Sequence, residues 1–121
     1  MTLTVVVWVV PERIDAVYII KNRVTNEYDT KGIYNGFHKV KRNAWDKLTH
    51  AKNHVVCKIG SFSKPINSMF NWYMDADFIE IGENGVGAVI PVSDYLREYY
   101  KDSYKITNLT KEQKDRLELE D

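Results

Sequence analysis

The sequence predicts an α+β fold, and three observations support this class. The 121 residues fit a single domain, 1–121, because domains usually hold about 100 to 150 residues. Short runs of β-branched and aromatic residues stand between turn signals, which is typical of antiparallel strands. Other stretches repeat apolar residues at helical spacing. We expect an antiparallel sheet of about four to six strands packed on one main helix, about residues 43–59, with two C-terminal helices.

The first part of the chain predicts strands. Residues 2–10 are apolar and rich in valine, and Pro11 ends this first expected strand. Residues 16–24 have the composition of a second strand. The polar residues 25–27 then signal a turn, from which residues 28–30 are expected to return as a short third strand.

The main helix is expected to begin after Asn43, whose side chain can cap the first turn, and to end at Gly60. Apolar side chains recur along it every three to four residues, so they share one face that should pack on the core. These residues are Ala44, Leu48, Ala51, Val55 and Ile59.

A hairpin is expected in the second half. Residues 77–81 alternate polar and apolar side chains, as in a half-buried strand. Asn84 and Gly85 form a strong turn signal that leads into a second strand at residues 86–90. Just before this hairpin, residues 70–74 are rich in aromatic side chains and fit either a strand or a loop.

Two helices are expected after the hairpin. Ser93 can cap the first, which runs from residue 94 to about residue 102. Thr110 and Gln113 form a capping-box pattern that opens the second, which runs to about residue 119. Together these helices should close the core at the C-terminal end.

Charge is unevenly distributed along a chain whose net charge is zero. Residues 21–64 hold ten lysines and arginines against three acids, and they hold all three histidines. Residues 65–121 hold six basic side chains against twelve acids. A basic segment in a neutral protein attracts anions locally, so it predicts a site for a phosphorylated or acidic compound. The two halves of neighbouring copies could also attract one another, which favours a homo-oligomer.

A basic stripe is expected beside the apolar face of the main helix, formed by Lys47, His50, His54 and Lys58. Two interpretations stay open: a face in contact with water, or a face that contacts an anion at the border of a pocket. The spacing of the two histidines also suits two zinc ligands, but a third ligand is missing and the lysines would repel a cation. We therefore expect neither a metal nor another cofactor.

Asp75, Asp77 and Glu80 form an acidic cluster. Carboxylates two residues apart on a strand point to one face, as some magnesium sites require, so a metal-dependent phosphodiesterase is one hypothesis. No lysine follows at the spacing typical of nuclease strands, and exposed acids are common on half-buried strands. A polar edge is the favoured interpretation, and we expect no enzyme activity.

The cysteine content and the N-terminal run bear on location. Cys57 is the only cysteine, which excludes an internal disulfide and fits a reducing cytoplasm. The apolar run at residues 2–10 is shorter than the roughly 20 residues that span a bilayer, and it lacks the features of a signal peptide. We expect a cytoplasmic protein with no membrane partner.

Two stretches resemble small uncharacterised accessory proteins of tailed phages. Residues 18–28 read Tyr-Ile-Ile-Lys-Asn-Arg-Val-Thr-Asn-Glu-Tyr, and residues 44–54 read Ala-Trp-Asp-Lys-Leu-Thr-His-Ala-Lys-Asn-His. The chain has Asn26 and Thr49 where the family pattern has glycine. Many such proteins counter host defences, and some sequester cyclic nucleotide signals without cleaving them. The resemblance implies a small, oligomeric α+β protein of the host cytoplasm, with aromatic and basic groups in its pocket.

The function predicted from these observations is that of a phage-type anti-defence protein, which sequesters a small phosphorylated (cyclic) nucleotide signal without cleaving it. Aromatic rings would stack on the base, and cationic or amide side chains would contact phosphate or ribose. The expected ligand-binding residues are Lys21, Arg23, Tyr28, Tyr34, Lys47, His50, Lys52, Asn53, His54 and Trp72. The alternative is a protein inhibitor that docks on a host defence enzyme or nucleic-acid complex through the same basic face.

Overall fold

The computed structural model describes residues 16–31, 36–40, 43–60, 67–103 and 109–119, with the side chains of residues 67 and 68 left out. This part of the chain confirms the α+β class. It forms three strands and four helices, in the order β1 (Val17–Asn22), α1 (Leu48–Gly60), α2 (Asn67–Met74), β2 (Ala76–Gly82), β3 (Gly85–Pro91), α3 (Val92–Lys101) and α4 (Lys111–Arg116). None of the helices described is long and apolar enough to cross a membrane.

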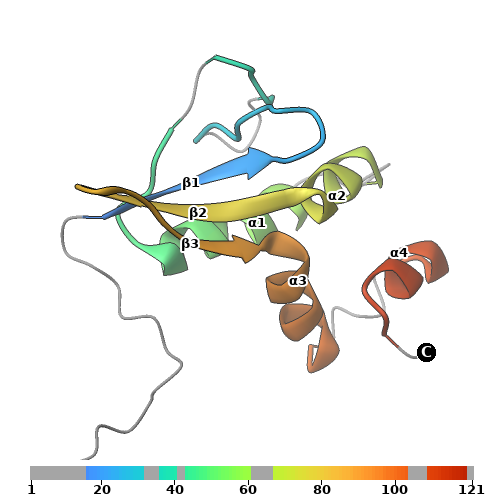
Figure 1. The fold of residues 1–121 in the computed structure, drawn as a ribbon. Helices are drawn as coiled ribbons and strands as arrows, with labels where there is room; N and C mark the ends of the chain where they lie inside the picture. Colours follow the sequence, from blue (N-terminus) through green and yellow to red (C-terminus); the bar gives the residue numbers. More distant parts are fainter. Residues whose placement is uncertain (1–15, 32–35, 41–42, 61–66, 104–108, 120–121) are drawn as a thin grey trace, which may run out of the picture.

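The described strands form one antiparallel sheet with β2 in the middle and β1 and β3 on either side (Figure 1). Ile20 of β1 pairs with Phe78 of β2, which in turn pairs with Ile90 of β3. The predicted hairpin of β2 and β3 turns at Gly85, whose φ of +104° is a conformation that residues with a Cβ rarely adopt. The described residues hold fewer strands than the expected four to six, and the first expected strand, residues 2–10, lies outside them.

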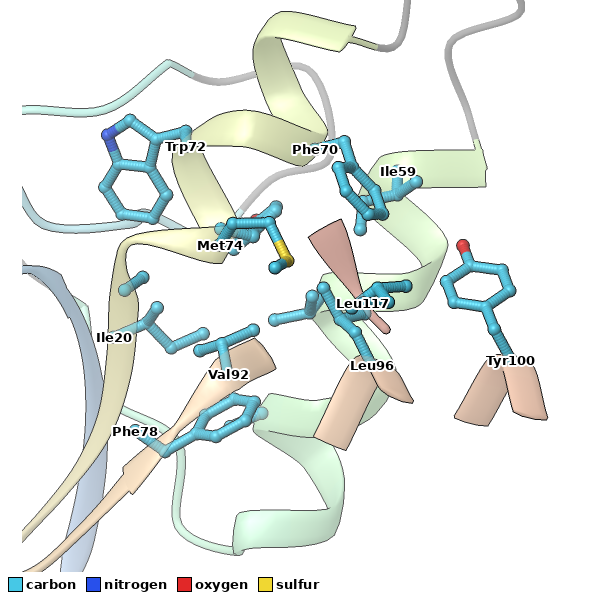
Figure 2. Close-up of a cluster of buried hydrophobic side chains, with 14 of the residues drawn as sticks. Ile20, Ile59, Phe70, Trp72, Met74, Phe78, Val92, Leu96, Tyr100 and Leu117 are labelled. Carbon is cyan, nitrogen blue, oxygen red and sulfur yellow. The ribbon is translucent and has the colours of Figure 1, made fainter. Parts of the chain in front are cut away.

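One face of the sheet carries the hydrophobic core. Ile20 and Phe78 lie there with Val92 and Leu96 of α3 and with Leu117, which follows α4 (Figure 2). Alternation of side chains across a strand explains this, because every second residue of β1 and β2 points to the same face. The remaining core contacts come from α1 and α2, through residues that include Ala51, Val55, Ile59, Phe70 and Tyr73.

The main helix begins later than predicted. α1 starts at Leu48 rather than after Asn43, and Trp45 instead adopts an extended conformation beside β1. The backbones of Tyr18 and Trp45 exchange two hydrogen bonds, with N···O distances of 2.7 and 2.8 Å. This pairing gives the backbone of Tyr18, at the outer edge of β1, its hydrogen-bond partners, and it buries the indole of Trp45. These two gains offset the loss of a first helical turn.

Two short segments also differ from expectation. Residues 28–30 form no strand, because Tyr28 makes only isolated bridges to Lys21 and His38. The aromatic run at residues 70–74 belongs to helix α2, which presents Phe70 and Tyr73 to the core at helical spacing. By contrast, α4 begins with the predicted capping box between Thr110 and Gln113.

Candidate functional site

A shallow recess lies beside α1 and brings part of the predicted site together. It has a volume of about 280 Å³ and is lined by Trp45, His50, Asn53, His54 and Cys57. The four residues from α1 occupy positions i, i+3, i+4 and i+7, so they lie on one side of the helix. Trp45 is held against that side by its backbone pairing with Tyr18, and its ring centre lies 4.8 Å from that of His54.

The two histidines of the recess have different surroundings. His50 is exposed, and its Nδ1 lies 3.1 Å from Oδ1 of Asp46, one helical turn earlier. The pKa of Asp46 is lowered, first by this hydrogen bond. The side chain of His54 is only 9% exposed and reaches toward the interior, where Nε2 lies 3.1 Å from Oδ2 of Asp29. His50 is therefore the imidazole that a ligand in solution meets first.

Behind the recess lies a buried polar cluster around Asp29. Nζ of Lys58 donates a hydrogen bond to Oδ1 of Asp29 at 2.7 Å, and the hydroxyl of Tyr73 donates one to Oδ2 at 2.5 Å. Asp29, Lys58 and Tyr73 are fully buried. The ammonium of Lys58 also lies 4.3 Å from the ring centre of Phe37, a cation–π contact. The cluster links the loop after β1 to α1 and α2.

The charges of the cluster balance one another. Burial alone would raise the pKa of Asp29, but the imidazole of His54 and the charge of Lys58 together outweigh it and lower that pKa. The pKa of Tyr73 is raised well above its ordinary value, first by burial and then by the negative charge of Asp29. Asp29 is therefore a buried carboxylate, and Tyr73 is a neutral donor to it.

One ring nitrogen of His54 lacks a hydrogen-bond partner within the described part of the chain. Its Nε2 is close enough to Asp29 for an ion pair, yet the nitrogen has no hydrogen-bond partner of good geometry there. A buried nitrogen without a partner costs free energy, because water would otherwise hydrogen-bond it. The imidazole thus lines the recess on one side and contacts the buried carboxylate on the other.

Most of the predicted cationic residues already have partners. The guanidinium of Arg23 lies 3.0 Å from Oδ1 of Asp77 and donates to the backbone oxygens of Met74 and Ala76. The ammonium groups of Lys21 and Lys52 each lie 5.4 Å from a tyrosine ring centre. Those rings belong to Tyr28 and Tyr95. Lys47 is exposed, and Lys58, expected on the same stripe, is instead in the interior.

The predicted stacking residues are not gathered at the recess. The indole of Trp72 is buried against Phe37, with ring centres 3.7 Å apart and planes 5° from parallel, and its Nε1 donates to Oε1 of Glu27. A base could stack on Trp72 only by displacing Phe37. Tyr28 is half-buried under Lys21, and Tyr34 lies outside the described residues.

The acidic residues do not converge on a metal site in the described part of the chain. Asp75 lies 3.5 Å from Arg116, Asp77 pairs with Arg23, and Glu80 is buried with its Oε2 accepting a hydrogen bond from the hydroxyl of Tyr18. Asp77 and Glu80 point to opposite faces of β2, because they are an odd number of residues apart. No group of three or more potential ligands is found among the residues described.

The Asp29 cluster was not predicted from the sequence, although one signal for it exists. Ala51, Val55, Lys58 and Ile59 follow the spacing of a helix face that packs on a core, so position 58 belongs to the apolar stripe. A lysine at such a position must find a buried acid. Which acid it finds is a long-range contact that helical spacing does not reveal.

Comparison of this chain with known protein families, with curated proteins and with solved structures gives no match. The geometry of the chain's own residues is therefore the basis for inferring its function.

Proposed function

We propose that the protein binds a small phosphorylated ligand of the nucleotide class at the recess beside α1, and that it sequesters the ligand rather than converting it. The observation that carries this proposal is the convergence of His50, Asn53 and His54 beside the indole of Trp45. Imidazole and amide groups can donate hydrogen bonds to phosphate oxygens, and an aromatic wall suits a planar ring. A phage-type anti-defence role remains the biological setting that we propose.

The geometry favours a binding site smaller than the one predicted from ten residues. Trp72 already stacks on Phe37, and Arg23 is held by Asp77 and two carbonyl oxygens. We therefore assign ligand contact first to His50 and Asn53, which are exposed on α1, and then to His54. A ligand phosphate would compete with Asp46 for His50, and such competition at an exposed pair costs little because the pair is weak.

The proposal is tested by thermal shift and calorimetry on the full chain with cyclic dinucleotides, cyclic trinucleotides, cyclic ADP-ribose isomers and inorganic phosphate. A ligand that binds the folded state raises the melting temperature by mass action. The His50→Gln variant, which keeps a polar side chain, should weaken binding by about tenfold, equivalent to one charged hydrogen bond. His38→Gln is the matched control, because His38 is exposed in the same basic segment but does not line the recess.

Recovery of the ligand separates sequestration from catalysis. Heat denaturation of the complex should release the ligand chemically intact, as judged by chromatography and mass spectrometry. Release of a cleaved product would overturn sequestration. Binding that is weakened equally by His50→Gln and His38→Gln would overturn the assignment of the recess, and a panel that produces no shift would overturn the ligand class.

A further inference from the structure

The buried cluster behind the recess holds one acid for two basic groups. Oδ1 of Asp29 accepts a hydrogen bond from Lys58 at 2.7 Å, and Nε2 of His54 lies 3.1 Å from Oδ2 of the same carboxylate. The charge of Lys58 therefore already matches that of Asp29. The hydroxyl of Tyr73 also donates to this carboxylate, but it is neutral and adds no charge. A proton added to His54 gives the cluster a net positive charge.

The hydrogen bonds that Asp29 already accepts leave little of it for His54. Oδ1 accepts from Lys58 and from the backbone N–H of Thr30, and Oδ2 accepts from Tyr73. Nε2 of His54, by contrast, has no hydrogen-bond partner of good geometry within the described part of the chain. A buried charge is costly unless it is paired and hydrogen-bonded. A protonated His54 therefore needs a second anion, on the side of the ring away from Asp29.

That side of the ring faces the recess, where none of the lining residues described is acidic. The side chain of His54 is only 9% exposed, so a charge on it is largely kept from water. Charges attract one another more strongly in such a setting than in water. The described groups that line the recess beside His54 are Trp45, His50, Asn53 and Cys57.

We propose that an anion enters the recess together with a proton, which His54 takes up to become the cation between the ligand and Asp29. The coupling rests on the proposed function, since it concerns the same recess and adds the charge state in which the recess binds. A protonated imidazole carries a hydrogen on each ring nitrogen, so it can donate on two sides at once. Positive and negative charges then alternate from Lys58 through Asp29 and His54 to the ligand. The recess should accordingly select an anion, such as a phosphodiester, over a neutral nucleoside.

Reciprocity gives this coupling a measurable consequence. If the anion favours the protonated form of His54, a lower pH must favour the anion by the same factor. Affinity should therefore rise as the pH falls from 8 to 6, where imidazoles ordinarily gain a proton. His50 is also an imidazole, but it is exposed and already lies beside Asp46, so its share of the effect should be smaller.

Sulfate tests the coupling on the full chain, because it is a tetrahedral anion whose charge stays constant between pH 6 and 8. An NMR titration with sodium sulfate at constant ionic strength should shift the amide signals of His50, Asn53 and His54. The dissociation constant should be at least about fivefold lower at pH 6 than at pH 8. His54→Gln should abolish this difference, and His38→Gln should preserve it, because His38 is exposed and does not line the recess. A difference that survives His54→Gln would overturn the coupling.

The imidazole signals of the parent protein test the same coupling without a substitution. Saturating sulfate should raise the pH at which His54 is half-protonated by at least about 0.7, the equivalent of a fivefold change in affinity, and leave His38 unchanged. Sulfate binding at the recess with the same affinity at both pH values would overturn the coupling alone. Absence of any sulfate-dependent shift in the recess amides would overturn the recess as an anion site, and the coupling with it.

Discussion

At the scale of single residues, the cluster around Asp29 is a buried and closely hydrogen-bonded feature of the described chain. Asp29 accepts hydrogen bonds from Lys58 and Tyr73 in an environment with no exposure to water. Breaking a buried ion pair by removing one partner is costly, because it leaves a charge without compensation. Replacing both partners removes the charges together, so its cost should be smaller than the sum of the two single changes.

We therefore expect Asp29→Asn and Lys58→Met each to lower the free energy of unfolding by about 3 to 5 kcal/mol. The double variant should lose clearly less than the sum of the two. Urea denaturation of the four proteins measures this coupling. Asp46→Asn serves as the control, since the exposed pair of Asp46 and His50 should contribute nothing measurable. Additive losses in the double variant would contradict a direct interaction between Asp29 and Lys58.

Sequence reasoning at this scale succeeded where neighbours are local. His50 and His54 were predicted to share a face because helical spacing places them together, and the structure brings them, with Asn53, to one recess. The partner of Lys58 could not be predicted, because Asp29 is 29 positions away along the chain. Whether any of the recess residues contacts a ligand stays a prediction.

At the scale of elements, the β2–β3 hairpin depends on a close approach across the two strands. A Cβ added at Gly87 would collide with Oε1 of Glu80. Glu80 is buried, and its other carboxylate oxygen accepts a hydrogen bond from Tyr18 at 3.0 Å. The carboxylate therefore cannot move aside without disturbing that bond. This contact explains why β3 has a glycine in the middle of a strand, where glycine is otherwise unfavourable.

We expect Gly87→Ala to destabilise the protein by about 1 to 3 kcal/mol, the cost of disturbing a buried hydrogen bond. Gly36→Ala is the matched control, because an added Cβ there would meet nothing within 4 Å. Urea denaturation compares the two variants with the parent protein. Equal stability of Gly87→Ala and the parent would show that Glu80 moves aside freely, contrary to the role assigned to it.

Two element boundaries were predicted well from a local signal, whereas α3 begins at Val92 after Pro91 rather than with the expected cap at Ser93. The turn at Asn84 and Gly85 and the capping box at Thr110 both lie where expected, since each depends on residues a few positions apart. The start of α1 was wrong because the backbone of Trp45 pairs with Tyr18 instead of extending the helix. Asn43 has a side chain that could cap a helix, but the long-range pairing of Trp45 with Tyr18 keeps the residues after Asn43 out of the helix.

At the scale of the whole molecule, folding pairs some charges of the basic segment 21–64, two of them within that segment and one with the acidic half of the chain. Lys58 is paired with Asp29, Arg23 with Asp77, and His50 with Asp46. Of these pairs, the one between Lys58 and Asp29 is shielded from water. It should therefore make the largest contribution to the change of the free energy of unfolding at low pH. The lowered pKa of Asp29 fixes the direction of that dependence.

The unfolded chain takes up a proton at Asp29 at a higher pH than the folded protein does, because folding lowers the pKa of Asp29 below its ordinary value of 3.8. The contribution of Asp29 to stability is therefore complete well above pH 4 or so, and it is lost as the pH falls through the folded pKa. Urea denaturation from about pH 6 to 2.5 should show the gap between the parent and Asp29→Asn closing below about pH 4. A gap that stays constant over that range would contradict a lowered pKa.

The amino-acid sequence by itself determined the α+β class, the β2–β3 hairpin, the capping box that begins α4 and the shared face of His50 and His54. Each of these follows from residues within about one or two turns of one another, where spacing and backbone preference decide the outcome. Only the tertiary structure decided that Lys58 is buried on Asp29, that Trp72 stacks on Phe37 and that Trp45 closes the recess. Those contacts join distant segments, and they form because a buried charge or ring must find a partner in the folded chain.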